Sequence, residues 1–124
     1  MNFNDIAIGT SDFKKLRVNN NYYIDKSMYI KDIVDNRSEV VLVTRPRRFG
    51  KTLNMSMLRY FFDCDAKDSK ELFEGLKIMD QGEKYTSKLG AYPCIYLTLK
   101  DVSDSNYENM ILDFKTAILE MYRE

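Results

Sequence analysis

The stretch that decides the expected fold runs from residue 39 to residue 53 and reads Glu-Val-Val-Leu-Val-Thr-Arg-Pro-Arg-Arg-Phe-Gly-Lys-Thr-Leu. Residues 39–44 are mostly apolar and β-branched and are closed by Pro46, which predicts a short strand buried on both faces. After this turn the apolar residues recur at helical spacing, which predicts an amphipathic helix over about 51–63. A buried strand that leads through a basic turn into a helix is an arrangement that binds phosphate.

The turn partly matches the phosphate-loop (Walker A) pattern G-x-x-x-x-G-K-[ST]. The match holds at Gly50, Lys51 and Thr52 and fails at the first glycine, where Arg45 stands. Gly50 would let the backbone approach a phosphate, Lys51 would place its ammonium against the β- and γ-phosphates, and Thr52 would bind Mg²⁺. The expected cofactors are therefore ATP and Mg²⁺. The residues expected to bind the nucleotide are Arg47, Arg48, Phe49, Gly50, Lys51, Thr52 and Leu53.

Arg45 and Pro46 are the departures from the pattern, because proline contributes no N–H to a phosphate cradle. Arg47 or Arg48 could compensate through side-chain contacts to phosphate. A different role for the patch Arg45, Arg47 and Arg48 is to bind a nucleic-acid backbone or an acidic partner. The plainest alternative is a basic loop that caps the strand, with Lys51 and Thr52 as ordinary first-turn residues of the helix.

The rest of the chain also alternates between predicted strands and predicted helices. Residues 93–99 predict a second buried strand, and residues 22–24 a short edge strand. Further helices are expected over about 27–34, 69–76 and 84–89, and a C-terminal helix follows the capping pattern that begins at Ser105. This order predicts an α/β fold, a partial P-loop NTPase-like layer of short parallel strands flanked by helices.

Composition limits the classes of function. The chain has 124 residues, with 19 basic and 19 acidic residues and no histidine. This length suits one domain, and the balanced charge excludes a globally basic nucleic-acid binder. Charge is uneven, however: residues 37–59 carry six bases and one acid, and residues 101–124 carry two bases and six acids. Cys64 and Cys94 stand far apart, so we expect buried thiols in a cytoplasmic protein. The sequence contains no segment typical of a signal peptide or a membrane span, so no membrane partner is expected.

At these residues the chain resembles the prokaryotic AAA-ATPase-like family of P-loop proteins. The resemblance begins in Ile8-Gly-Thr-Ser-Asp-Phe-Lys-Lys-Leu-Arg17 and continues through Tyr22-Tyr-Ile-Asp-Lys-Ser27. Its most specific segment is Arg45-Pro-Arg-Arg-Phe-Gly-Lys-Thr-Leu-Asn-Met-Ser-Met-Leu58, in which Arg45 is typical of the family. Residues 72–76 and 92–97 are also similar, so the likeness covers nearly the whole chain.

The resemblance implies that residues 1–124 form a single domain, the N-terminal part of an AAA-like ATPase domain that binds ATP and Mg²⁺. Related ATPases often place an adenine-contacting segment upstream of the phosphate loop, which makes Phe13, Tyr22 and Tyr23 candidates for stacking on the base. Family members usually continue through a Walker B strand with acidic residues, and many carry a PD-(D/E)XK nuclease-like domain. Neither is visible here, so hydrolysis would depend on further segments and the catalytic residues are unknown.

A second hypothesis is a non-catalytic, truncated relative that acts as a protein- or nucleic-acid-binding module or an inhibitor. A mobile-element protein directed against a nucleoprotein defence complex would fit this description. Its surfaces would be the patch of Arg45, Arg47 and Arg48 and the acidic C-terminal helix. Two parallel strands would also leave an exposed sheet edge, which suggests a protein partner or self-association.

Overall fold

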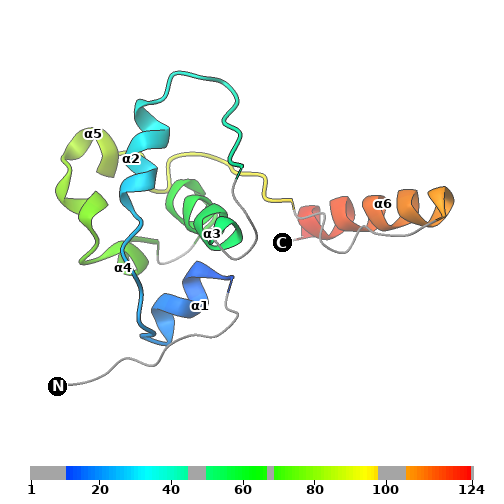
Figure 1. Ribbon diagram of the computed structural model, residues 1–124, viewed down its shortest axis with the longest axis horizontal. Helices are drawn as coiled ribbons and strands as arrows, with labels where there is room; N and C mark the ends of the chain where they lie inside the picture. Colours follow the sequence, from blue (N-terminus) through cyan, green and yellow to red (C-terminus); the bar gives the residue numbers. More distant parts are fainter. Residues whose placement is uncertain (1–10, 45–49, 67–68, 98–105, 124) are drawn as a thin grey trace. The chain divides into compact units, whose positions relative to one another are not determined.

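The computed structural model of the chain describes residues 11–44, 50–66, 69–97 and 106–123 (Figure 1). The chain divides into two compact units, Met1–Pro93 and Cys94–Glu124, which we describe one at a time. The extent of the expected domain, 1–124, stays a prediction. The described elements of the first unit are short helices: α1 (Phe13–Val18), α2 (Met28–Asp35), α3 (Lys51–Phe62), α4 (Ser69–Phe73), the 3₁₀ helix η1 (Lys77–Asp80) and α5 (Glu83–Thr86).

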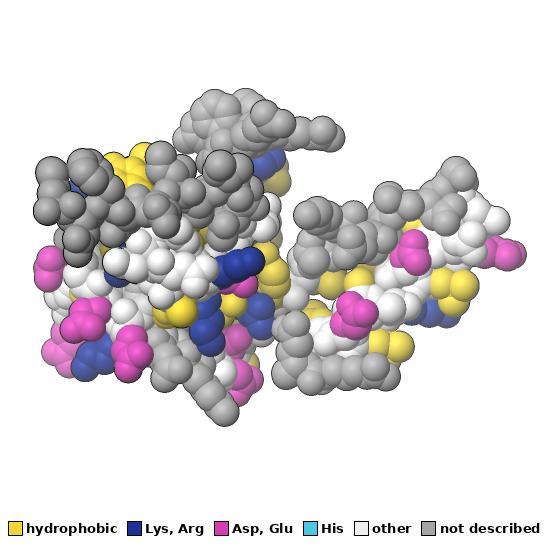
Figure 2. Space-filling model, turned by 90° about the horizontal axis from the view of Figure 1, so that it is seen from below, with side chains coloured by type: hydrophobic (Ala, Val, Ile, Leu, Met, Phe, Trp, Pro, Cys, Tyr) yellow, Lys and Arg dark blue, Asp and Glu magenta, His cyan; other side chains and the backbone are white. Residues whose placement is uncertain are grey.

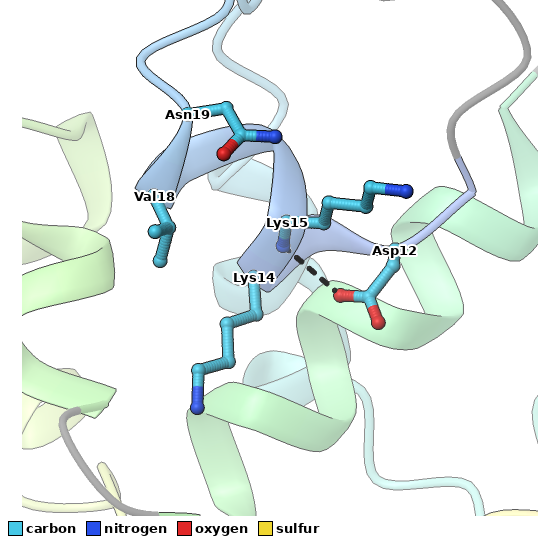
Figure 3. Close-up of a pocket in the computed structure, with 5 residues that line it drawn as sticks. All are labelled: Asp12, Lys14, Lys15, Val18 and Asn19. Atoms are coloured by element: carbon cyan, nitrogen blue, oxygen red, sulfur yellow. Dashed lines mark hydrogen bonds between the residues drawn. The ribbon is translucent and has the colours of Figure 1, made fainter.

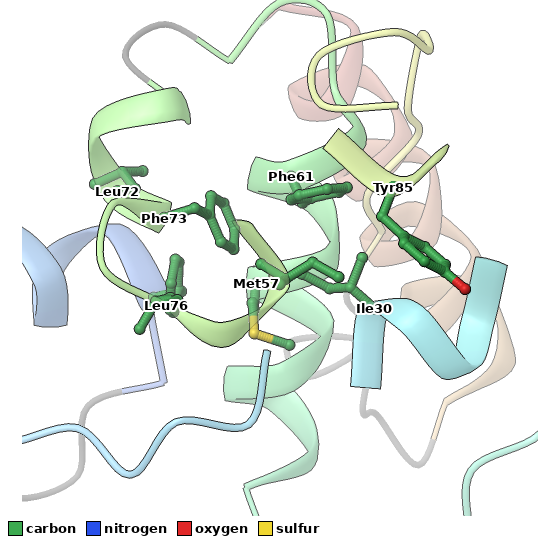
Figure 4. Close-up of a cluster of buried hydrophobic side chains, with 9 residues drawn as sticks. Ile30, Met57, Phe61, Leu72, Phe73, Leu76 and Tyr85 are labelled. Carbon is green, nitrogen blue, oxygen red and sulfur yellow. The ribbon is translucent and has the colours of Figure 1, made fainter. Parts of the chain in front are cut away.

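Helix α3 is the centre of the first unit. Its inward face carries Ser56, Met57 and Phe61, which are all buried. In Figure 4, side chains of α4 and the following turn face Met57 and Phe61, and Ile30 of α2 approaches the same cluster. The ring of Phe73 lies 5.1 Å from that of Phe61 at an angle of 83°, an edge-to-face contact that aromatic pairs prefer. The full core consists of Phe13, Ile30, Met57, Phe61, Leu72, Phe73, Leu76, Ile78 and Tyr85.

A polar joint connects the start of α2 to η1. The Asp25 carboxylate accepts hydrogen bonds from the backbone N–H groups of Ser27 (2.8 Å) and Lys77 (2.9 Å), and the Ser27 hydroxyl accepts one from the Ile78 N–H (3.2 Å). Burial raises the pKa of Asp25, but the hydrogen bonds from Ser27 and Lys77 and the nearby Lys77 charge outweigh it, so the net pKa is lowered. These bonds fix segments that are 51 to 52 residues apart in the sequence.

Two further contacts hold the outer helices. The Arg17 guanidinium donates to the carbonyls of Leu72 and Glu74, both at 2.9 Å, and so satisfies acceptors at the end of α4. The Tyr85 hydroxyl donates to the carboxylate of Asp35, with its two oxygens at 2.8 and 3.0 Å, which ties α5 to α2. The hydrogen bond from Tyr85, followed by that from Lys84, lowers the pKa of Asp35.

The predicted strand layer is wrong. The described residues contain no strand, and 39–44, 93–97 and 22–24 are neither helix nor strand. Val40 and Leu42 are each 83% exposed and Ile95 is 79% exposed, where the prediction placed them in a buried sheet. A strand is stable only when a neighbour satisfies its backbone groups, and no hydrogen bond to residues 39–44 occurs within the described residues. The α/β fold class is therefore replaced by a helical one.

The described residues contain an isolated parallel β-bridge between Asp63 and Tyr92. The Tyr92 N–H donates to the Phe62 carbonyl (2.9 Å), and the Cys64 N–H donates to the Tyr92 carbonyl (2.7 Å). The backbone around Tyr92 thus pairs with the end of α3 instead of with residues 39–44. Cys64 is exposed here and Cys94 is half-buried, so the prediction of two buried thiols is also wrong.

The helix predictions fared better. Three of the predicted helices are confirmed as α2, α3 and α6 (Tyr107–Arg123). Two others are shorter than predicted: the one expected over 84–89 is α5, which ends at Thr86, and the one expected over 69–76 is α4, which ends before Gly75 at φ +82°. Helix α1 and η1 were not predicted, because each is too short to show a clear period.

The second unit contains α6 (Tyr107–Arg123), a 17-residue helix. Large apolar side chains are exposed on it, among them Tyr107 (72%) and Tyr122 (77%). Figure 2 shows hydrophobic side chains beside acidic ones in this unit, and acidic and basic side chains interspersed on the face of the first unit. Among the described residues, the structure has no helix with the length and apolar character that a membrane span requires.

Candidate functional site

The predicted phosphate loop is described only at its end. Arg45, Arg47, Arg48 and Phe49 lie outside the described residues, so their predicted roles stay predictions. Gly50 is the residue before the first turn of α3, and it adopts a left-handed conformation with φ 74° and ψ 20°. A Cβ atom built on Gly50 would have no heavy atom within 4 Å, so the requirement for glycine comes from the backbone conformation and not from lack of space.

The residues that follow Gly50 form the first turn of α3. Lys51 and Thr52 are exposed at the start of the 12-residue helix α3, and Leu53 is half-buried against the core. Since Gly50 has no side chain, it cannot cap the N–H groups of the first turn, which remain available to an anion. The positive end of the helix dipole and the Lys51 ammonium both favour negative charge at this place.

The three aromatic candidates for base stacking differ in exposure. Phe13 is fully buried, with its ring 4.9 Å from that of Phe73 and 5.5 Å from that of Tyr23. Tyr23 is half-buried, and its hydroxyl donates to the Met57 sulfur at 3.4 Å. Burial is the main reason that the pKa of Tyr23 is raised. Tyr22 is 60% exposed and therefore presents the most open ring of the three. The stacking role itself stays a prediction.

The structure adds a residue that the sequence analysis did not single out. Ser56 is buried on α3, where its hydroxyl accepts a hydrogen bond from the backbone N–H of Phe13 at 3.0 Å. The Tyr60 hydroxyl, one turn later, donates to the Asp12 carboxylate at 3.4 Å. The signal in the sequence is a small polar residue next to Met57 on an otherwise apolar helix face. Such a residue requires a hydrogen-bond partner when it is buried.

A hollow of about 260 Å³ lies against α1 (Figure 3). Its lining includes Asp12, Lys14 and Lys15, and the Asp12 carboxylate is turned toward the Lys15 N–H, from which it accepts a hydrogen bond at 3.2 Å. The volume lies just below the range of about 300–1,000 Å³ that is usual for ligand sites. Asp12 also serves as the cap of α1, so these contacts have a structural purpose.

Three possible metal ligands lie together at the end of α3. Donor atoms of Asp63, Cys64 and Asp65 are within 4.8 Å of one another. The Asp63 carboxylate is already used by the protein: one oxygen accepts the Asp65 N–H at 3.0 Å, and the other lies 3.9 Å from the Arg59 Nε. This cluster therefore closes the turn after α3, and the expected Mg²⁺ position at Thr52 is separate from it.

Among the comparisons with known proteins, a family model identifies the family. The family model described as "Predicted AAA-ATPase" matches residues 7–124. A curated protein of Azotobacter chroococcum mcd 1, described as "Uncharacterized protein in vnfD 5'region", is 32% identical over 77 residues. That alignment covers 61% of this chain and 14% of the relative, so the chain spans a small part of the relative's length. No solved structure matches the chain. Because the family model covers nearly all of the sequence, the chain belongs to the AAA-ATPase-like family.

Proposed function

We propose that the chain binds ATP with Mg²⁺ at the N-terminal end of α3. The observation that carries this proposal is the sequence Gly50-Lys51-Thr52 at the start of that helix, in a chain of the AAA-ATPase-like family. Gly50 adopts a left-handed conformation and has no side chain with which to cap the first turn, and the two residues after it are exposed. This arrangement favours an anionic ligand.

Electrostatics support a negatively charged ligand. Four of the seven residues 45–51 are cationic, and they precede or begin a helix whose N-terminal end is itself positive. A lysine in this first turn is unfavourable by about 0.3–1 kcal/mol unless an anion is near. A triphosphate would offset this repulsion, with Lys51 against its terminal phosphates and Thr52 on the Mg²⁺ that it carries.

The proposal concerns binding. Hydrolysis needs a carboxylate that holds Mg²⁺ and a second group that orients the attacking water, and the sequence assigns neither role to a residue. Arg47, Arg48 and Phe49 are proposed to complete the contacts to phosphate, and Tyr22 is the aromatic side chain best exposed to meet the base.

The test is calorimetric titration of ATP with Mg²⁺ into the whole chain and into Lys51→Ala. We expect saturable binding, weakened about tenfold or more by Lys51→Ala, because a charge-assisted contact to phosphate contributes about 1.5–3 kcal/mol. The matched control is Lys70→Ala, which removes an exposed lysine of α4 and should leave the affinity unchanged. Absence of saturable binding, or equal affinity of Lys51→Ala and the unaltered chain, would refute the proposal.

Exposed apolar residues support a second candidate function, association with a protein partner. Val40, Leu42 and Ile95 are each about 80% exposed, and α6 adds further apolar side chains. A contiguous exposed apolar patch on either unit would be typical of an interaction site. Analytical ultracentrifugation over a range of concentrations tests the simplest form, self-association. A mass that stays monomeric, together with no captured partner, would count against this function.

A further inference from the structure

Helix α6 carries an open apolar row along its whole length. The residues of this row follow one another at alternate spacings of four and three, which place them on one face of the helix: Tyr107, Ile111, Phe114, Ile118 and Met121. This spacing is typical of a helix that packs lengthwise against a second helix. None of residues 107–122 is buried, and Tyr107 is 72% and Phe114 38% exposed. Within the described residues, the face that should be covered is therefore open.

The charge of this segment limits what can cover that face. Residues 101–124 carry six acidic and two basic residues. Nucleic acid and anionic lipid both repel such a segment, so neither is a suitable occupant. A 17-residue helix with no buried side chain among 107–122 is also marginal in water by itself, because most helical stability in proteins comes from packing an apolar face. A protein surface is the occupant that fits both observations.

The charges beside the apolar row suit a second copy of the same helix. Glu108 and Lys115 each directly follow a residue of the row, so both lie on the same flank of it. Both side chains are exposed, and neither takes part in an ion pair within the described residues. In an antiparallel pair of α6 helices, Phe114 of each helix packs against Ile111 of the other. Glu108 of each helix then lies beside Lys115 of the other, whereas a parallel pair would bring the two acidic N-terminal parts together.

We propose that α6 is a self-association surface and that its occupant is α6 of a second copy of this chain, antiparallel to the first. The pairing is two-fold symmetric, so it closes on itself as a dimer. The apolar rows supply the contact area, and two equivalent Glu108–Lys115 ion pairs set the direction. The inference goes beyond nucleotide binding. It rests on the second candidate function, association through exposed apolar residues, and gives that function a surface and a partner.

Sedimentation equilibrium of the whole chain over a range of concentrations tests the pairing. We expect a reversible equilibrium between monomer and dimer. Phe114→Ala should weaken the dimer about tenfold or more, because a large aromatic contact at the centre of the row is lost from both copies. Circular dichroism checks that the variant keeps its helix content.

Charge reversal tests the direction without changing the apolar row. Glu108→Lys and Lys115→Glu each place like charges together, and each should weaken the dimer about fivefold or more. The double variant Glu108→Lys/Lys115→Glu restores opposite charges and should restore the dimer. An equimolar mixture of the two single variants should form a heterodimer that is tighter than either variant paired with itself. The matched control is Glu120→Lys, an equal charge change at an exposed position away from the row, which should leave the dimer unchanged.

The outcomes separate this inference from the other proposals. A chain that stays monomeric at every concentration would overturn the inference, and so would single charge variants that dimerise as tightly as the unaltered chain. A dimer that persists unchanged in Phe114→Ala uses a different surface, so the inference would fail while the second candidate function stands. None of these results bears on ATP binding, because Lys51 and Thr52 belong to α3 in the first unit.

Discussion

Replacement of Ser27 by alanine gives a sharp test of the polar joint between α2 and η1. Ser27 is fully buried, and its hydroxyl accepts the Ile78 N–H at 3.2 Å. Although Ser27 precedes the first turn of α2, its side chain makes no capping hydrogen bond. Ser27→Ala therefore removes no cap from the helix. The change leaves the Ile78 N–H without an acceptor beside a fully buried side chain, and it also removes the Ser27 side-chain hydrogen bond that helps to lower the pKa of Asp25.

The expected magnitude follows mainly from the lost acceptor, because the Asp25 carboxylate keeps its hydrogen bonds from the backbone N–H groups of Ser27 and Lys77. An unsatisfied buried donor costs about 1–3 kcal/mol, and the cavity left by one oxygen atom is small. We therefore expect the free energy of unfolding to fall by about 2 kcal/mol. With a urea dependence of about 1–2 kcal/mol per molar for a chain of this size, the midpoint should drop by about 1–2 M.

Urea unfolding followed by far-ultraviolet circular dichroism measures this midpoint, which suits a helical chain that contains no tryptophan. Ser38→Ala is the matched control, because Ser38 is exposed and its change should stay within about 0.5 kcal/mol. Amide exchange at Ile78 should accelerate in Ser27→Ala only. A midpoint for Ser27→Ala that equals that of Ser38→Ala would show that the joint contributes nothing, and the reasoning would be wrong.

Three more changes test other contacts. The pKa of Asp25 is lowered, so its ionised form stabilises the fold at pH values above the ordinary pKa of 3.8. The free energy of unfolding of the unaltered chain should exceed that of Asp25→Asn at neutral pH, and this difference should shrink as the pH falls below 3.8. A difference that does not change with pH would contradict this reasoning. Arg17→Lys replaces the guanidinium, whose Nε and Nη2 each donate to one carbonyl at the end of α4, with a single nitrogen. It should cost about 1–2 kcal/mol in urea unfolding, against no change for Arg37→Lys on the surface. Phe61→Ala should lower the free energy of unfolding in urea by about 3–5 kcal/mol, and Phe61→Leu should lower it clearly less, because leucine fills more of the buried space. Equal losses for the two variants would refute the packing argument.

The sequence predicted the helices because their periodicity is a local property. Helix α3 follows from apolar residues that fall on one face, and the left-handed Gly50 before it agrees with the motif that placed a helix start there. The strand predictions failed for the opposite reason. Residues 39–44 have strand composition, but a strand also needs a neighbour whose backbone is free to pair, and that neighbour is not a local property. The backbone near Tyr92 pairs with the end of α3 instead.

In the candidate site, too, local features could be predicted from the sequence and long-range contacts could not. Gly50, Lys51 and Thr52 could be named from the sequence because a motif specifies the chemistry of each position. Ser56 could not, since its hydrogen bond joins residues 43 positions apart and no spacing rule connects them. Exposure separated the aromatic candidates: Tyr22 and Tyr23 are neighbours in the sequence, yet Tyr23 is partly enclosed by the core and Tyr22 is open.

The pairing of residues 61–64 with residues 90–92 also has an entropic consequence. The N–H groups of Gly90, Tyr92 and Cys64 donate across this pairing at 2.7–2.9 Å, so the chain between its two sides is a closed loop. The entropy lost in closing a flexible loop grows only with the logarithm of its length, by about 0.6 kcal/mol for each doubling. Extra residues in this segment would therefore add little to the entropy of closing the loop, provided that core residues such as Phe73 and Ile78 keep their places. The pairing itself therefore constrains the length of this loop only weakly, and the packing of its core residues constrains it more.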